Sequence, residues 1–143
     1  MSAQRLPYST LSPAAYQGLL GAKQALDHSP LGKTLIELVY LRLSQINGCA
    51  FCLEMHSASL RKEGVPAAKL DSLAGWRVSH RFDERERAAL AWAESLADVA
   101  ASHAPDADYQ PLEACFSEVE ISDLTIAIAL MSAFNRLAIG MRL

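Results

Sequence analysis

The chain has 143 residues and a mass of 15.5 kDa, which is enough for one domain with its own core. It carries 13 basic and 16 acidic side chains, a net charge of -3 and no basic stripe, so we expect no nucleic-acid partner. Hydrophobic residues make up 51% of the chain, which excludes an intrinsically disordered protein, and aromatic residues only 7%. The core is therefore expected to consist mainly of leucine, alanine, isoleucine and valine, in helices.

The sequence favours a cytoplasmic protein without a membrane partner. A signal peptide has a positively charged start followed by a run of apolar residues. The N-terminal residues here contain no such run, so no signal peptide is predicted. The longest apolar stretch, Leu124 to Phe134, is interrupted by Thr125 and Ser132 and is too short to cross a bilayer. Three cysteines, an odd number, argue against the disulfide framework of a secreted domain.

Proline, glycine and capping residues divide the first half of the chain into helices. Ser12, as a cap before Pro13, predicts a helix over about 13–27. An amphipathic helix is predicted over 34–46, because its apolar residues recur every three or four positions. A third helix is expected from about 49 to 63, with Gly64 as its stop.

The second half follows the same pattern. Pro66 predicts a short helix to about residue 73, and residues 105–111 a loop with at most a turn of helix. Capping boxes begin two longer helices, with Asp83 and Glu86 in the first and Ser117 and Glu120 in the second. The last helix, about 118–139, is apolar almost all round, so we expect a neighbouring subunit to cover part of it. The predicted fold is a single all-α domain over residues 1–143 that assembles into an oligomer.

Cys49, Cys52 and His56 are the residues that carry chemistry. On a helix, side chains three and four positions apart project from one stripe. Cα atoms of Cys49 and Cys52 are then about 5–6 Å apart, which a disulfide tolerates. The start of a helix lowers the pKa of a thiol from its free value of about 8.5, and His56 lies one turn beyond Cys52, where it can take a proton.

Glu37 is a carboxylate within an apolar segment of the preceding helix. If the two helices pack antiparallel, Glu37 approaches His56, where a carboxylate would fix the imidazole tautomer and raise its basicity. The spacing alone leaves other interpretations open. Cys49, Cys52, His56 and Cys115 form a possible zinc site, and the cysteines could equally be small core residues. Glu37 could be a solvated residue of the first helical turn.

Other notable side chains have structural interpretations. Trp76 and Trp92 lie on helical segments and are predicted to be core or interface residues. Cys115 has no partner cysteine nearby in the sequence, and it is predicted to be a buried small hydrophobic residue. Three histidines beside polar neighbours are predicted to lie on the surface: His28, His80 and His103. Asn135 and Arg136 interrupt the apolar last helix, and we assign them no catalytic role.

Four residues at fixed spacing carry a family resemblance. Glu37 is followed after eleven residues by Cys49-Ala50-Phe51-Cys52, and three residues later by His56. This pattern resembles the AhpD-like branch of the carboxymuconolactone decarboxylase family, and the resemblance extends over about residues 34–139. The flanking matches are Ser57-Ala58, Glu63-Gly64-Val65-Pro66, the segment 82–90 and the segment 135–139.

The resemblance implies an all-α fold assembled into trimers or hexamers, and a peroxidase or thiol–disulfide exchange activity. Carried over residue by residue, it implies Cys52 as the thiol that attacks peroxide and Cys49 as the resolving thiol. Glu37 and His56 would form a proton relay. It further implies a peroxide substrate, a thioredoxin-like or lipoyl-bearing protein as reductant, and no metal or organic cofactor.

Phe51 departs from the pattern of the well-studied peroxidases of this family, which have histidine immediately before the second cysteine. An apolar side chain there removes a proton carrier and raises the thiol pKa by desolvation. The alternative function is a thiol–disulfide oxidoreductase or redox sensor acting on protein disulfides. A non-catalytic oligomeric or zinc-binding protein is a third. The decarboxylase branch generally lacks the cysteine pair, so the pair argues against lactone decarboxylation.

Overall fold

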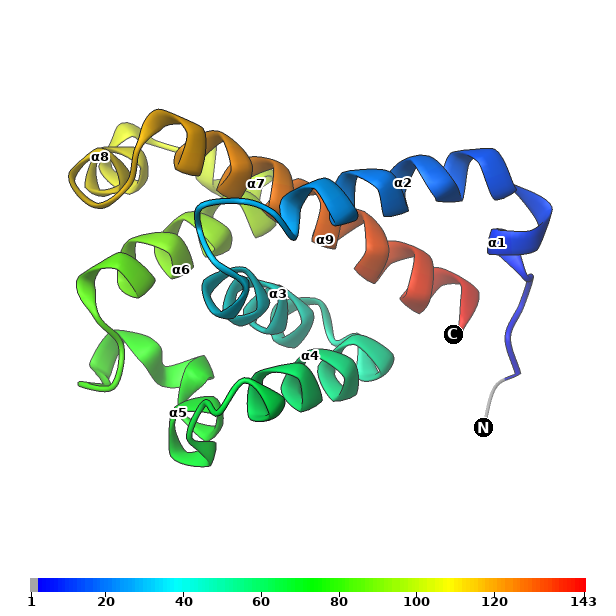
Figure 1. Ribbon diagram of the computed structural model, residues 1–143, viewed down its shortest axis with the longest axis horizontal. Coiled ribbons are helices and arrows are strands. Elements are labelled where there is room, and N and C mark those ends of the chain that lie inside the picture. The colour runs from blue at the N-terminus through cyan, green and yellow to red at the C-terminus, as the bar shows by residue number, and fades with distance from the viewer. Residues whose placement is uncertain (1–2) are drawn as a thin grey trace.

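In the computed structural model, which describes residues 3–143, the chain is all-α, and no strand occurs in this part of the sequence. The predicted fold class is confirmed. A short 3₁₀ helix, η1, lies between α5 and α6. Figure 1 shows the helices, which are α1 (Tyr8–Leu11), α2 (Pro13–Leu26), α3 (Lys33–Asn47), α4 (Ala50–Lys62), α5 (Ala67–Asp71), η1 (Leu73–Val78), α6 (Glu84–Ala97), α7 (Val99–Ser102), α8 (Asp106–Cys115) and α9 (Glu118–Met141).

Helix α3 is the centre of the fold. It packs against α4, α6 and α9, while α2 crosses α9 and contacts it (Figure 1). All seven residues from Leu35 to Leu41 are buried, so over this segment α3 has no polar face, unlike the amphipathic helix predicted from its spacing. Glu37 lies inside the protein because these other helices surround α3.

Two clusters of apolar side chains fill the space on either side of α3. The larger joins α3 to α6, α8 and α9, and includes Trp92. The smaller joins α3 to α4, η1 and α6, and includes Trp76. Both tryptophans are buried, as predicted.

The helix ends follow the predicted signals at most positions. Both capping boxes are present: Asp83 with Glu86 begins α6, and Ser117 with Glu120 begins α9. Pro13 is the first residue of α2, but the Ser12 side chain makes no capping hydrogen bond. Gly48 ends α3 at φ 71°, a left-handed conformation that glycine adopts without steric cost.

Residues 106–115 differ from the predicted loop, because they form helix α8 with Pro111 inside it. Proline removes one helical hydrogen bond, which is why the sequence favours a break there. Packing of α8 on α6 compensates: Leu112 is fully buried, and the ring of Tyr109 lies 5.6 Å from that of Trp92, edge to face. Tertiary contact therefore overrides the local signal.

Helix α9 is long and apolar enough, by length and composition, to cross a membrane, but much of it forms the core here. Its inner face contributes Leu124, Ala127 and Ile128, all almost fully buried. The opposite face is not covered by the part of the chain that the structure describes, as Ile126 is 50% exposed and Ala129 is also exposed. The prediction that α9 has more apolar surface than one chain covers is consistent with this uncovered face.

Candidate active site

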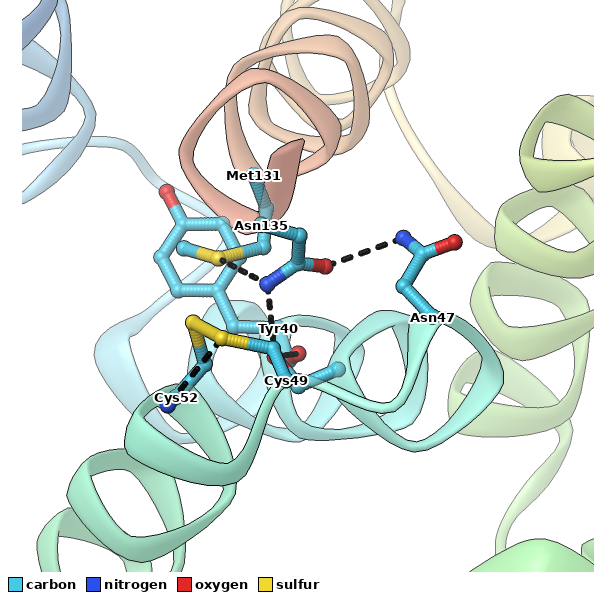
Figure 2. The surroundings of a disulfide bond; sticks show 7 residues. Tyr40, Asn47, Cys49, Cys52, Met131 and Asn135 are labelled. Atoms are coloured by element: carbon cyan, nitrogen blue, oxygen red, sulfur yellow. Dashed lines mark hydrogen bonds between the residues drawn. A yellow bond between two sulfur atoms is a disulfide. The ribbon is translucent and has the colours of Figure 1, made fainter. Parts of the chain in front are cut away.

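Cys49 and Cys52 form a disulfide at the start of α4 (Figure 2). Their Cα atoms lie 5.3 Å apart. The helix begins at Ala50, so Cys49 is its N-cap rather than its first residue, and its Sγ accepts a hydrogen bond of 3.3 Å from the Cys52 N–H. An N-cap position beside unpaired backbone N–H groups stabilises a thiolate once the disulfide is reduced.

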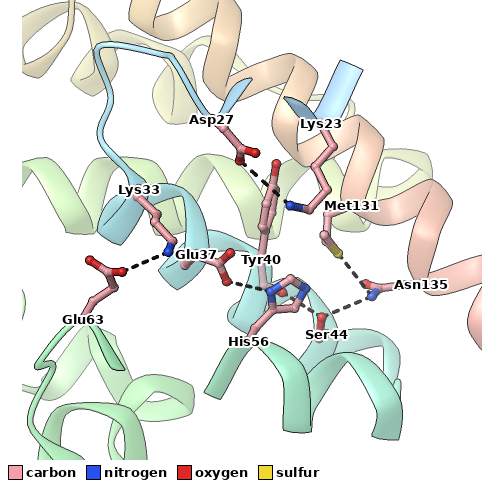
Figure 3. Close-up of polar contacts among 10 residues, drawn as sticks. All are labelled: Lys23, Asp27, Lys33, Glu37, Tyr40, Ser44, His56, Glu63, Met131 and Asn135. Carbon is pink, nitrogen blue, oxygen red and sulfur yellow. Dashed lines mark hydrogen bonds and ion pairs between the residues drawn. The ribbon is translucent and has the colours of Figure 1, made fainter. Parts of the chain in front are cut away.

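His56 lies one turn further along α4, and its Nδ1 is 2.7 Å from Oε2 of Glu37 on α3 (Figure 3). The predicted approach of these two residues is present in the structure. An ionised carboxylate can only accept a hydrogen bond, so Nδ1 donates and the neutral imidazole carries its lone pair on Nε2. His56 is almost fully buried and Glu37 largely so, which protects the pair from solvent screening.

Two buried polar atoms among the described residues have no hydrogen-bond partner: His56 Nε2 and the Tyr40 hydroxyl. The unpaired Nε2 is free to accept a proton. Burial raises the pKa of Tyr40 far above its ordinary value of 10.0, and the nearby charges of Glu37 and Asp27 raise it further. Tyr40 is therefore a neutral phenol rather than a base. Its ring lies 5.3 Å from that of His56 and holds the imidazole by packing.

Asn135 on α9 connects this site to the centre of the fold (Figures 2 and 3). Its Nδ2 donates to Ser44 Oγ at 3.1 Å and contacts Met131 Sδ at 3.6 Å, and its Oδ1 accepts from Asn47 Nδ2 at 3.0 Å. Asn47 ends α3 two residues before Cys49, so Asn135 anchors the turn that carries the disulfide.

Three hollows surround the cysteines and the histidine. One of about 240 Å³, lined by Cys49, Phe51 and Arg142, opens beside the first cysteine. A second of about 210 Å³ lies beside Cys52, with largely apolar walls. A third of about 460 Å³ is lined by Glu37 and His56 together with polar side chains of α2 and α4. The two cysteines thus face different surroundings.

The remaining candidates lie elsewhere. Cys115, at the end of α8, is half-buried beside the Glu84 carbonyl, so the prediction that it is buried was wrong. Its place at a helix end explains the exposure. The predicted surface histidines, His28, His80 and His103, are exposed. Among residues 3–143, no group of three or more histidine, cysteine or acidic side chains is placed to hold a metal ion.

The sequence predicts the proximity of Cys49 to Cys52 and of Glu37 to His56, but not the places of Tyr40 and Asn135 beside them. The signal for Asn135 was its position as a polar side chain inside an apolar helix, which in a buried setting requires partners. Tyr40 had no such signal, because a tyrosine in an apolar helix is typical of any core.

Comparison with known proteins identifies relatives with the same fold. Residues 13–95 match the sequence profile described as the carboxymuconolactone decarboxylase family. The crystal structure of a protein of unknown function from Agrobacterium tumefaciens, with a suggested role as the antioxidant defence protein AhpD, superposes with a TM-score of 0.93. It is 36% identical in sequence, over 98% of this chain and 96% of that chain.

Two further relatives cover nearly all of this chain. The protein YdfG of Bacillus subtilis is 29% identical over 96% of this chain and 94% of its own length. A peroxidase-related protein from Ralstonia eutropha, described as an alkylhydroperoxidase AhpD core, is 25% identical with a TM-score of 0.79. The match covers 94% of this chain and 73% of that protein.

Proposed function

The chain belongs to the carboxymuconolactone decarboxylase family, in its AhpD-like branch, and from this premise we propose that it is a cysteine-based peroxidase. The substrate is an organic hydroperoxide or hydrogen peroxide. The observation that carries the proposal is a cysteine pair at a helix start, one turn from a buried histidine whose Nε2 is unpaired and whose Nδ1 is bound by a carboxylate.

The proposed cycle starts from the reduced dithiol. His56 takes the proton of Cys52, and the thiolate attacks the terminal oxygen of the peroxide, so that an S–O bond forms and the O–O bond breaks. The leaving alkoxide receives a proton through His56 and departs as an alcohol; with hydrogen peroxide the leaving hydroxide departs as water. Cys52 is then a sulfenic acid, two electrons more oxidised. Cys49 attacks its sulfur, releases water and leaves the disulfide.

Glu37 acts through His56, because its carboxylate holds the imidazole in one tautomer and stabilises the imidazolium that forms when Cys52 is deprotonated. A dithiol partner then returns two electrons by thiol–disulfide exchange. We propose a thioredoxin-like or lipoyl-bearing protein as this partner, a cytoplasmic location, and assembly into a homotrimer or homohexamer through faces such as that of α9.

The experiment that tests this is a thiol count on reduced protein before and after one equivalent of hydroperoxide. The wild type is expected to lose two thiols. Cys49→Ser should give a sulfenic acid that a dimedone probe traps on Cys52, and Cys52→Ser should not react. The reverse pattern would assign the attack to Cys49.

A second function, thiol–disulfide exchange with protein disulfides, is favoured by the hydrogen bond from Cys52 N–H to Cys49 Sγ. This bond stabilises Cys49 as a thiolate, the form that attacks or leaves a disulfide. Survival of all thiols after peroxide, together with rapid oxidation by a disulfide reagent, would replace the peroxidase proposal with this one.

A further inference from the structure

The hollow beside Cys52 has the composition of a binding pocket for an apolar group. Its walls include Tyr8, Tyr16, Leu20, Met55 and Phe134, and Lys23 is the one charged side chain that residues 3–143 contribute to it. We call it the aromatic pocket. A pocket of this kind, with few polar groups beside a reactive atom, is typical of a site for a small organic molecule.

The aromatic pocket is built by side chains from both ends of the chain. Tyr8 of α1 packs edge to face on Tyr16 of α2 at 5.7 Å, and Tyr16 packs in the same way on Phe134 of α9 at 6.4 Å. The segment before α1 is fixed to the end of α9, since Arg5 N–H donates to the Met141 carbonyl at 2.8 Å. The wall is thus held in place by a continuous aromatic stack.

Helix α1 lies outside the region that defines the family, because the family match begins at residue 13. Tyr8 therefore lies outside the residues that match the family, and it adds to walls that come from α2, α4 and α9. A wall added in this way changes which substrates fit without altering the cysteine pair.

The size of the aromatic pocket limits its occupant. A dry cavity of about 150 Å³ holds benzene, and the aromatic pocket has about 210 Å³. It shares Lys23 and Met55 with the larger polar hollow that contains Glu37 and His56. An organic group in the aromatic pocket therefore has a sulfur of the disulfide pair on one side and the polar hollow on another, where a leaving oxygen can be protonated.

We propose that the aromatic pocket binds the organic group of the substrate and selects hydroperoxides carrying one aromatic ring or a compact branched alkyl group over hydrogen peroxide. Tyr8, Tyr16 and Leu20 determine this specificity. The inference rests on the proposed function. For cumene hydroperoxide, the Cys52 thiolate takes the terminal oxygen as a sulfenic acid, the O–O bond breaks, and the alkoxide leaves as cumyl alcohol after protonation.

The test compares two rate constants for loss of thiols from reduced protein, one with cumene hydroperoxide and one with hydrogen peroxide. The wild type is expected to favour cumene hydroperoxide by at least about tenfold, the size of effect that apolar pockets give. Leu20→Trp fills the pocket and should lower the ratio by about tenfold. The matched control Leu11→Trp, on the exposed side of the same N-terminal arm, should keep the wild-type ratio.

A second measurement needs no variant and no turnover. Cumyl alcohol, the product, should slow alkylation of Cys52 in the reduced protein much more than that of Cys49, as followed by peptide mass spectrometry. An equal rate with both peroxides, or a ratio unchanged in a folded Leu20→Trp protein, would overturn the specificity while leaving the peroxidase proposal intact. If neither peroxide oxidises the thiols, the peroxidase proposal fails, and protection of Cys52 by cumyl alcohol alone then decides whether the pocket binds this class of molecule.

Discussion

The carboxylate of Glu37 and the imidazole of His56 come from different helices and meet at 2.7 Å in the interior of the protein. The hydrogen bond fixes which imidazole nitrogen carries the proton and leaves Nε2 as the free base. Since His56 is almost fully buried and Glu37 largely so, the charge on Glu37 acts on His56 with reduced screening. In the proposed cycle, any effect of Glu37 on the cysteines therefore passes through His56.

The first prediction concerns the charge on Glu37. In Glu37→Gln the amide oxygen still accepts the hydrogen bond from Nδ1, so the ring keeps its orientation, but the imidazolium loses its stabilising charge. The rate constant for peroxide with reduced protein should fall by about a hundredfold. Stopped-flow thiol loss measures it, with Glu54→Gln, an exposed position on α4, as the control. Equal rates in the two variants would contradict a role for Glu37.

The second prediction concerns Phe51, which is 43% exposed and lines the hollows beside both cysteines. In Phe51→His an imidazole next to the thiols favours their ionised form, so the rate with hydrogen peroxide should rise by about two- to tenfold. Because the side chain is exposed, stability should change by about 0.5 kcal/mol or less. The pH dependence of iodoacetamide alkylation should shift to lower pH in Phe51→His but not in Phe51→Leu. A shift of the same size in both would show that only loss of the aromatic ring matters.

The sequence predicted the site more completely than it predicted its surroundings. Helical periodicity alone places Cys49, Cys52 and His56 on one stripe, because their spacing is local. The contact between Glu37 and His56 is not local, and it followed from the turn at Gly48 that folds α4 back on α3. The burial of Glu37 could not be predicted from the pattern of its own helix, because it depends on α6 and α9 covering the other sides of α3.

Helix α8 shows the opposite case, in which a local signal was misleading. Pro111 favours a break in the helix, because the lost hydrogen bond and the clash of the proline ring with the preceding turn together cost about 3 kcal/mol. Burial of Leu112 and the contact between Tyr109 and Trp92 occur only after α6 and α8 have come together. Such contacts lie outside any sequence window, and for the same reason the role of Asn135 was not predicted.

The third prediction concerns Asn135, which is fully buried and hydrogen-bonded to Ser44 and Asn47. Asn135→Leu should destabilise the protein by about 1–3 kcal/mol, because Asn47 loses its acceptor and the buried Ser44 hydroxyl keeps only its bond to the Tyr40 carbonyl. It should also slow formation of the disulfide after peroxide, since Asn47 then holds the turn before Cys49 less firmly. Urea unfolding measures the first effect and the lifetime of the dimedone-reactive sulfenic acid the second. The control is Arg136→Leu, at the next, exposed position of α9. Loss of stability with an unchanged sulfenic acid lifetime would limit Asn135 to a structural role.

The fourth prediction concerns the pH dependence of stability. Burial alone would raise the pKa of Glu94, but hydrogen bonds from Trp76, Arg42 and Arg77 lower it below its ordinary value of 4.5. A carboxylate whose pKa is lowered on folding stabilises the folded state fully above its unfolded pKa, and this stabilisation is lost as pH falls through the folded pKa. The loss therefore begins below about pH 5.

Glu94→Gln should lower the free energy of unfolding at pH 7 by about 1.5–3 kcal/mol, the range for hydrogen bonds to a charged group. The difference from wild type should shrink as pH falls from 5 towards 3. Urea unfolding followed by far-ultraviolet circular dichroism at several pH values measures this. Glu54→Gln, at an exposed position within α4, is the control, because it should follow the wild-type profile. A difference that stays constant from pH 7 to pH 3 would contradict the assignment to the ionised form of Glu94.

The last prediction concerns the uncovered face of α9, where Ile126 is 50% exposed and the neighbouring Ala129 leaves room for a close approach. If copies of this chain associate through this face, as proposed, a charge there is buried unpaired at the contact. Ile126→Glu should therefore reduce the molar mass measured by light scattering to that of a monomer or smaller assembly, with an unchanged helical circular dichroism spectrum. Val78→Glu, at a valine that is 94% exposed on η1, should keep the mass of the wild type. A wild type that is already monomeric, or an Ile126→Glu variant of unchanged mass, would show that this face is not the contact.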